Sequence, residues 1–310
     1  MIGIEKRIGT EKFKQRIYLQ TSSQVKLPHQ GERFFRLEQY IPIDKITRMG
    51  LKATGMHKAA YTNFLNVKVV NQEWKIRNLP PKFEGFRIMQ LSDLHADLDT
   101  QLTNKIIRQI QNTKHDAAVI TGDFRNKSDG PHEVCVSETA KIVAALHPRR
   151  WGILGNHDNI EMTSDLEKVG LPILLNEVVS ITKDRQKLWI AGIDDPHFYK
   201  THDLGKVRKE IPANACAVLL SHSPEVYKKA AELNFDLQLS GHTHGGQLCL
   251  PTGRHIVVPL PKYTDKKIIC GRWSHNELQG YTSPGTGSCA IAARMFCPPE
   301  ITIHILSRSS

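Results

Sequence analysis

From residue 64 onward, short apolar segments alternate with longer amphipathic ones, a pattern typical of strands alternating with helices. Strands are predicted at residues 64–76, 86–91, 117–121, 150–154, 187–192, 216–221, 235–240, 280–283 and 300–306. Helices are predicted at 100–113, 133–146 and 224–233, and a long loop at 250–263, which contains Pro and Gly. This alternation predicts an α/β fold in which layered sheets are flanked by helices.

The first 63 residues follow a different pattern and are predicted to form a basic arm outside a domain that spans residues 64–310. Residues 1–41 show no clean period, so we expect an extended or loosely ordered segment. At 43–60, apolar residues recur at helical spacing, which predicts one short amphipathic helix weakened by Gly50 and Gly55. This helix could lie on a membrane interface, or it could pack on the main domain.

The positive charge is concentrated in this arm. The chain has 42 Lys and Arg against 31 Asp and Glu, a net charge of +11. Residues 1–63 hold 12 basic and 5 acidic residues, a net of +7, which leaves +4 for the other 247 residues. Such a segment attracts an anionic surface, or it is a solvated arm with no specific partner. Acidic lipid is favoured over nucleic acid, because the core has little excess charge and no aromatic-rich basic stripe.

The six cysteines show no C-x-x-C spacing, which predicts reduced thiols and a cytoplasmic location. No apolar run follows the basic start, and no stretch approaches ~18 consecutive apolar residues, so neither a signal peptide nor a transmembrane helix is expected. If residues 43–60 bind lipid, the expected place is peripheral, at the inner face of the membrane.

Five short polar motifs each follow a predicted buried strand. They are Ser92-Asp93-Leu94-His95, Thr121-Gly122-Asp123, Gly155-Asn156-His157-Asp158, Ser221-His222-Ser223 and Gly241-His242-Thr243-His244-Gly245-Gly246. Ligands of open α/β sheets gather outside the carboxyl ends of the strands, so the five motifs should converge on one site. A single motif is weak, since a Gly-Asp pair is commonly a turn and a single His is commonly structural. All five together make a strong signal.

The side chains in these motifs predict a site for two metal ions. Asp, Asn and His without Cys offer mixed oxygen and nitrogen donors, which suits Mn, Fe or Zn better than Ca. Seven candidate donors exceed the four ligands of one zinc ion, and they fit two ions ~3.5–4 Å apart that share a carboxylate. Two such ions can hold a hydroxide between them and clamp a phosphoryl oxygen, which supports in-line attack on a phosphorus ester.

The order of the motifs resembles the calcineurin-like metallophosphoesterase superfamily over about residues 64–307. The segments FRIMQLSDLH, ILLNEVVSI, LWIAGIDDP, GHTHGGQLCLP and GTGSCAIAARMFCPPEITIHIL are similar to the branch of bacterial phosphodiesterases of the YaeI and YkuE type. That branch is related to enzymes that cleave UDP-2,3-diacylglucosamine. The resemblance implies a four-layer α/β/β/α sandwich with two mixed sheets.

The resemblance also implies a role for each site residue. The first ion would be held by Asp93, His95, Asp123 and His244, and the second by Asp123, Asn156, His222 and His242, with Asp123 as the bridge. Manganese is the first choice, and iron or zinc are the alternatives. His157 would act on the leaving oxygen, oriented by Asp158. Asn156 would also contact the substrate phosphate. Arg125 lies close to Asp123 in sequence, so it could bind a phosphate oxygen or form a surface salt bridge.

The predicted function is hydrolysis of a phosphodiester or pyrophosphate bond. The basic amphipathic segment favours a lipid-linked substrate such as UDP-2,3-diacylglucosamine, whereas the site alone fits a soluble phosphodiester equally well. A non-catalytic scaffold on the same fold is disfavoured, because every expected ligand position is filled.

Overall fold

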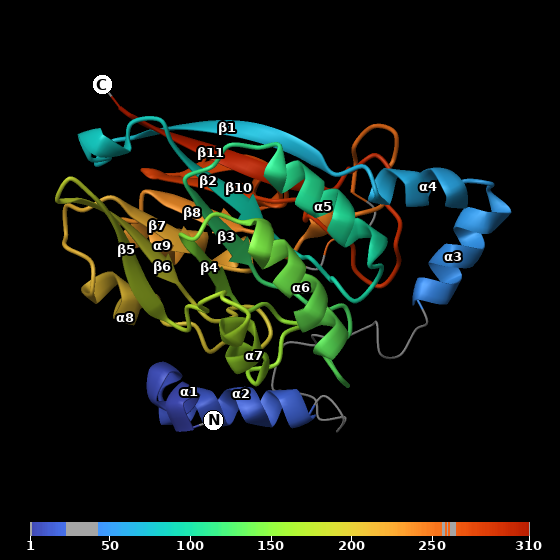
Figure 1. The fold of residues 1–310 in the computed structure, drawn as a ribbon, viewed down its shortest axis with the longest axis horizontal. Helices are drawn as coiled ribbons and strands as arrows, with labels where there is room; N and C mark the ends of the chain where they lie inside the picture. Colours follow the sequence, from blue (N-terminus) through green and yellow to red (C-terminus); the bar gives the residue numbers. More distant parts are fainter. Residues whose placement is uncertain (1, 23–42, 256–257, 259, 261–264, 310) are drawn as a thin grey trace.

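The computed structural model describes residues 2–22, 43–255, 258, 260 and 265–309. Its strands form two mixed sheets that pack face to face, with helices covering the outer face of each (Figure 1). The expected fold class, a four-layer α/β/β/α sandwich with two mixed sheets, is confirmed.

The first sheet has the strand order β1-β11-β2-β3-β4. Its strands are β1 (Lys68–Ile76), β2 (Phe86–Leu91), β3 (Ala117–Thr121), β4 (Arg150–Ile153) and β11 (Glu300–Arg308). Strands β2, β3 and β4 are parallel, whereas β11 is antiparallel to β2 and parallel to β1. The carboxyl ends of β2, β3 and β4 therefore meet at one edge.

The second sheet has the order β5-β6-β7-β8-β10-β9. Its strands are β5 (Glu177–Lys183), β6 (Gln186–Gly192), β7 (Ala217–Leu220), β8 (Leu237–Ser240), β9 (Gly271–His275) and β10 (Leu278–Thr282). Strands β6, β7, β8 and β10 are parallel, and the two edge strands are antiparallel to their neighbours. Every residue of β7 and β8 is buried, as expected for parallel strands covered on both faces.

Apolar side chains fill the space between the sheets and beneath the helices. Between the sheets, Val119 of β3 belongs to the same buried cluster as Val218 of β7 and Leu239 of β8. The outer face of the first sheet is covered by α5 (Gln101–Gln111), α6 (Glu133–Ala145) and α7 (Met162–Lys168), and that of the second by α8 (Leu204–Lys209) and α9 (Tyr227–Glu232). Short 3₁₀ turns complete the fold: η2 (Pro81–Phe83), η3 (Pro224–Val226), η4 (His244–Gly246) and η5 (Lys266–Ile268).

The N-terminal residues are more ordered than the sequence predicts. The expectation of an extended arm is wrong for residues 2–22, which form helices α1 (Ile2–Ile8) and α2 (Thr10–Ser22) along one side of the molecule (Figure 1). Arg7 forms ion pairs with Glu167 and Glu177, and Arg16 is fully buried against Asp194. These partners lie more than a hundred residues away, so local periodicity could not reveal them. The rest of the predicted arm, residues 23–41, lies outside the described residues.

The predicted helix at 43–60 is two helices, α3 (Ile43–Ala53) and α4 (His57–Phe64). Gly55 breaks it with a φ of +70°, a backbone conformation that suits glycine. Leu51 packs in a buried cluster with Ile291 and Met295, whereas Met49 is 70% exposed. Strand β1 begins at Lys68 rather than at residue 64, because the predicted first strand overlaps the end of α4.

Candidate metal centre

The five polar motifs meet where the two sheets adjoin. Each of their expected ligands follows the end of a strand by two to four residues. Asp93 and His95 follow β2, Asp123 follows β3, Asn156 follows β4, His222 follows β7, and His242 and His244 follow β8. The structure brings the donor atoms of these residues together in two overlapping groups.

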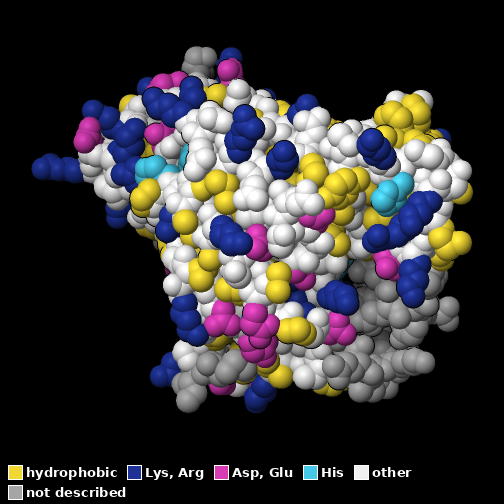
Figure 2. Space-filling view, turned by 45° about the vertical axis from the view of Figure 1, so that its right-hand side comes forward, with side chains coloured by type: hydrophobic (Ala, Val, Ile, Leu, Met, Phe, Trp, Pro, Cys, Tyr) yellow, Lys and Arg dark blue, Asp and Glu magenta, His cyan; other side chains and the backbone are white. Residues whose placement is uncertain are grey.

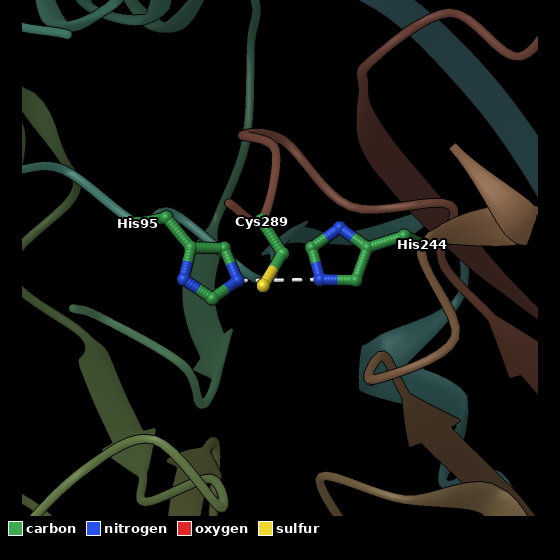
Figure 3. Close-up of side chains that lie close together, drawn as sticks. All are labelled: His95, His244 and Cys289. Carbon is green, nitrogen blue, oxygen red and sulfur yellow. Dashed lines mark hydrogen bonds between the residues drawn. The ribbon is translucent and has the colours of Figure 1, made fainter. Parts of the chain in front are cut away.

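The first group contains Asp93, His95, Asp123 and His244, each with one donor atom within 4.8 Å of the others. The Nε2 atoms of His95 and His244 face each other at 3.2 Å (Figure 3). Nε2 of His244 lies 3.6 Å from Oδ1 of Asp93. All four residues are buried.

The second group contains Asp123, His222 and His242, again with donor atoms within 4.8 Å of one another. Nε2 of His222 lies 3.2 Å from Oδ2 of Asp123 and 3.0 Å from Oδ1 of Asn156. The amide oxygen of Asn156 therefore joins this group. Asp123 is the residue that the two groups share.

The backbone that carries these ligands is unusual. Five of the seven have left-handed φ angles, namely Asp93 (51°), His95 (40°), Asp123 (55°), His242 (71°) and His244 (53°). For residues other than glycine this conformation is uncommon, costs about 1–3 kcal/mol each, and concentrates at functional sites. A side chain at Gly155 would clash with the carboxylate of Asp123, and one at Gly241 would clash with Ser92. Two of the motif glycines are therefore required by close approach.

The carboxylate of Asp158 holds two of the loops in place. It accepts hydrogen bonds from the backbone N–H groups of Gly155 (2.8 Å), Asp123 (2.8 Å) and Phe124 (2.9 Å). The prediction that Asp158 orients the His157 ring therefore needs correction: its oxygens are directed at backbone amides. Nδ1 of His157 instead lies 2.6 Å from the carbonyl oxygen of Asn126, a residue that the sequence analysis did not assign to the site.

Burial and mutual charge set the protonation of the site. Burial raises the pKa of Asp93 to about 6 and lowers the pKa of His95 to about 3. For Asp123, the nearby His222 and His157 outweigh the effect of burial and bring its pKa well below the ordinary value. For His222, burial is outweighed by Asp123 and Asp93, which raise its pKa to about 10. Asp123 and His222 thus form a buried ion pair.

The residues present fit a pair of divalent ions. Buried, closely spaced carboxylate, amide and imidazole donors are a costly arrangement unless a cation compensates them. Metals bind neutral imidazole and ionised carboxylate, so an ion at the second group would displace the proton that Asp123 and Asp93 favour on His222. The mixed oxygen and nitrogen donors match transition-metal ions of the Mn, Fe and Zn type.

Arg125 is not placed as a phosphate ligand. Its side chain is buried, and its guanidinium donates to the carbonyl oxygens of Asp129 and Gly130 in its own loop. The backbone carbonyl of Arg125 lies 2.7 Å from Nδ1 of His95. Arg125 therefore contributes by shaping the loop that orients His95.

Several neighbours of the site were not predicted from the sequence. The ring of His197 lies 4.3 Å from that of His242, and its Nδ1 pairs with Glu225 at 3.0 Å. The buried Arg294 donates to the carbonyl oxygen of His244 at 2.8 Å. Cys289 places its sulfur beside His95 and His244. Their signals were weak, because His197, Cys289 and Arg294 each follow the preceding strand by five residues or more.

Comparisons with known proteins give one consistent group of relatives. The family pattern described as "Calcineurin-like phosphoesterase" matches residues 86–246. YkuE of Bacillus subtilis, an uncharacterized metallophosphoesterase, is 30% identical over 244 residues, which cover 75% of this chain and 82% of that protein. The phosphodiesterase YaeI of Escherichia coli is 27% identical over 231 residues, covering 70% and 81%. The UDP-2,3-diacylglucosamine pyrophosphatase LpxG of Chlamydia trachomatis is 24% identical over 302 residues, covering 76% and 88%.

Proposed function

Because the chain belongs to the calcineurin-like phosphoesterase family of metal-dependent hydrolases, we propose that it cleaves a phosphodiester or pyrophosphate bond with two divalent ions. Asp93, His95, Asp123 and His244 would hold one ion, and Asp123, Asn156, His222 and His242 the other. The observation that carries the proposal is the position of Asp123, whose carboxylate belongs to both donor groups. A carboxylate has two oxygens and can serve two ions, which a neutral imidazole cannot do.

When bound, the two ions supply Lewis acidity toward phosphoryl oxygens and lower the pKa of water. Proton transfer to the leaving group would be the role of His157. A carbonyl oxygen can only accept, so the bond to Asn126 holds a proton on Nδ1 of His157, and Nε2 is the ring nitrogen that would act on the substrate. A protonated Nε2 can donate to the leaving oxygen as the ester bond breaks. Asp158 contributes by holding the loops that carry Asp123 and His157.

For the substrate, we favour a lipid-linked phosphorus compound of the UDP-2,3-diacylglucosamine type. LpxG, one of the relatives, is named for that substrate. Helix α3 offers a surface suited to an anionic membrane: Ile46 is 57% and Met49 70% exposed, between Lys45, Arg48 and Lys52. Figure 2, in which this end of the molecule is turned forward, shows Lys and Arg side chains interspersed with apolar ones. A soluble phosphodiester is the alternative substrate.

The manner of membrane contact would be peripheral. Among the residues that the structure describes, no helix has both the length and the apolar character that crossing a bilayer requires. The basic and exposed apolar side chains of α3 are the reason we place the proposed contact at the anionic inner face of a membrane.

Hydrolysis assays on metal-depleted protein test the proposal. After Mn²⁺, Fe²⁺ or Zn²⁺ is added back, we assay cleavage of bis-p-nitrophenyl phosphate and of UDP-2,3-diacylglucosamine. The number of bound metal ions per chain is measured in parallel. We expect two ions per chain, Mn²⁺ as the best activator, and faster cleavage of the lipid-linked compound. Well-folded protein that binds ions but cleaves neither compound would favour a scaffold. Cleavage of only the simple diester would favour the soluble alternative.

A further inference from the structure

The sulfur of Cys289 lies against the first group of metal-binding candidates. Its Sγ is within 4.8 Å of a ring nitrogen of both His95 and His244. In Figure 3 the sulfur projects between the two rings, close to the line that joins their Nε2 atoms. The same sulfur is 4.0 Å from Nε2 of His157. Three imidazoles from three different loops thus converge on one thiol.

The loop that carries Cys289 is fixed from both sides. The side-chain amide of Gln247 accepts from the backbone N–H of Cys289 at 2.8 Å and donates to its carbonyl oxygen at 3.0 Å. On the other side, the N–H of Ala290 donates to Oδ1 of Asn126 at 2.8 Å. Gln247 follows the His242–His244 motif and Asn126 follows Asp123, so both ligand-bearing loops position the thiol. Such support is what keeps a ligand oriented toward a metal.

The other cysteines near the site are turned elsewhere. Cys249 donates to the carbonyl oxygen of Gly245 at 3.2 Å, and Cys297 donates to that of His244 at 3.4 Å. These two thiols therefore hydrogen-bond to the backbone of the loop that carries His244. Cys289 is the cysteine whose sulfur joins the histidine nitrogens within the described part of the chain.

We propose that Cys289 provides, with His95 and His244, a sulfur donor for thiophilic divalent ions such as Zn²⁺ and Cd²⁺ at the first metal position. Sulfur and imidazole donors favour such ions, whereas Mn²⁺ prefers oxygen. Binding replaces the S–H bond with a sulfur–metal bond and releases the proton to solvent, without electron transfer. Cys289 thus tunes which ion the site retains. The inference rests on the proposed metal function, because it uses two of the same ligands.

Cobalt substitution of the full chain tests this inference, since a cobalt–thiolate bond gives an intense near-ultraviolet charge-transfer band in addition to the visible ligand-field bands. The proteins compared are wild type, Cys289→Ser, and Cys270→Ser as a control cysteine. We expect the charge-transfer band in wild type and in Cys270→Ser, and its loss in Cys289→Ser with the visible bands retained. Zn²⁺ affinity should fall by roughly 10- to 100-fold in Cys289→Ser, with Mn²⁺ affinity changed little.

The two proposals fail in different ways. Visible cobalt bands without a charge-transfer band in wild type would overturn the role of Cys289 but would still agree with a metal site. Absence of all cobalt bands would count against the metal site itself. Alkylation of Cys289 by iodoacetamide, followed by mass spectrometry, gives a second measurement. We expect Zn²⁺ to protect Cys289 and Mn²⁺ not to, and equal alkylation with and without Zn²⁺ would overturn the inference.

Discussion

Nη1 of Arg16 donates to Oδ1 of Asp194 at 2.7 Å, and both side chains are completely excluded from solvent. Nη2 of Arg16 donates to the backbone carbonyl of Asp158 at 2.8 Å, and its guanidinium stacks 3.9 Å from the centre of the Tyr199 ring. Asp158 follows β4 of the first sheet, and Asp194 follows β6 of the second. One side chain of an N-terminal helix therefore connects the loop that carries His157 and Asp158, after the first sheet, with the loop that follows β6 of the second.

Arg16→Ala should destabilise the fold by about 3–5 kcal/mol, because it leaves the carboxylate of Asp194 buried without its cation. Urea unfolding followed by circular dichroism measures the change. Lys14→Ala is the matched control on the same helix, since the Lys14 side chain is 69% exposed and pairs with an exposed Glu11. Equal effects of the two substitutions would show that the buried ion pair is unimportant.

Asp123→Asn should abolish most activity and reduce the content of both ions, because one oxygen of the shared carboxylate becomes an amide nitrogen that cannot bind metal. Metal content measured by plasma mass spectrometry, alongside turnover, checks this. Asp116→Asn changes a partly buried carboxylate away from the site and should leave both quantities near wild type. Loss of only one ion in Asp123→Asn would argue against a bridging carboxylate.

His157→Ala should lower turnover by roughly 10²–10⁴-fold with metal content intact, since it removes the proton donor and no predicted ligand. The comparison is between a substrate with a good leaving group, such as a nitrophenyl ester, and one with a poor alcohol leaving group. The defect should be larger for the poor leaving group. If the variant instead loses metal, His157 is a ligand and its assigned role is wrong.

His304 should make stability depend on pH. It is fully buried between Nε1 of Trp74 (2.9 Å) and Oε1 of Gln90 (2.9 Å), and burial lowers its pKa from 6.5 to about 3. Between these values the unfolded chain binds a proton that the folded chain does not. Its contribution to stability is thus complete above about pH 6.5 and is lost as the pH falls toward 3, at up to about 1.4 kcal/mol per pH unit.

The variant His304→Gln isolates this contribution, because glutamine keeps an acceptor for Trp74 and a donor for Gln90 without titrating. Unfolding free energies measured in urea from about pH 6.5 down to about pH 4 should fall less steeply in the variant than in wild type. Parallel slopes would mean that His304 does not titrate differently in the folded and unfolded chains.

Helix α3 should bind anionic vesicles through its exposed apolar residues. Replacing Ile46 and Met49 together by Ser removes that surface and should weaken co-sedimentation with phosphatidylserine vesicles, while binding to neutral vesicles stays weak throughout. Val134→Ser is the control, since Val134 is 56% exposed on α6. Unchanged vesicle binding in the double variant would remove the structural support for a lipid-linked substrate.

The buried strands were the most predictable part of the fold. Strands β2 and β3 were predicted with their observed limits, because both consist mostly of apolar residues and are buried on both faces. Strand β5 was missed because it lies at an edge and is only partly buried, and β9 because it mixes exposed and buried residues. Helices α7 and α8 were also missed, because their seven and six residues are too few to show a helical period.

The site was predictable where a side chain itself does the chemistry. The family resemblance implied that His95 and His244 share one ion, which stays a prediction, and in the structure their Nε2 atoms lie 3.2 Å apart. Contacts made by the backbone were not predictable, as the carbonyl of Asn126 shows, because any residue has a carbonyl. Cys289 follows β10 by seven residues in a segment without regular structure, so only the fold reveals its position.

Strand β11 has a consequence for how a cell makes this protein. It lies between β1 and β2, although Glu300 is translated 209 residues after Leu91 (300 − 91). A ribosome therefore makes both neighbours long before the strand that separates them, and their facing edges have no partner while those residues are translated. The first sheet closes only after the last strand leaves the exit tunnel. During that interval the unpaired edges of β1 and β2 are open to pairing with other chains, which is a route to aggregation.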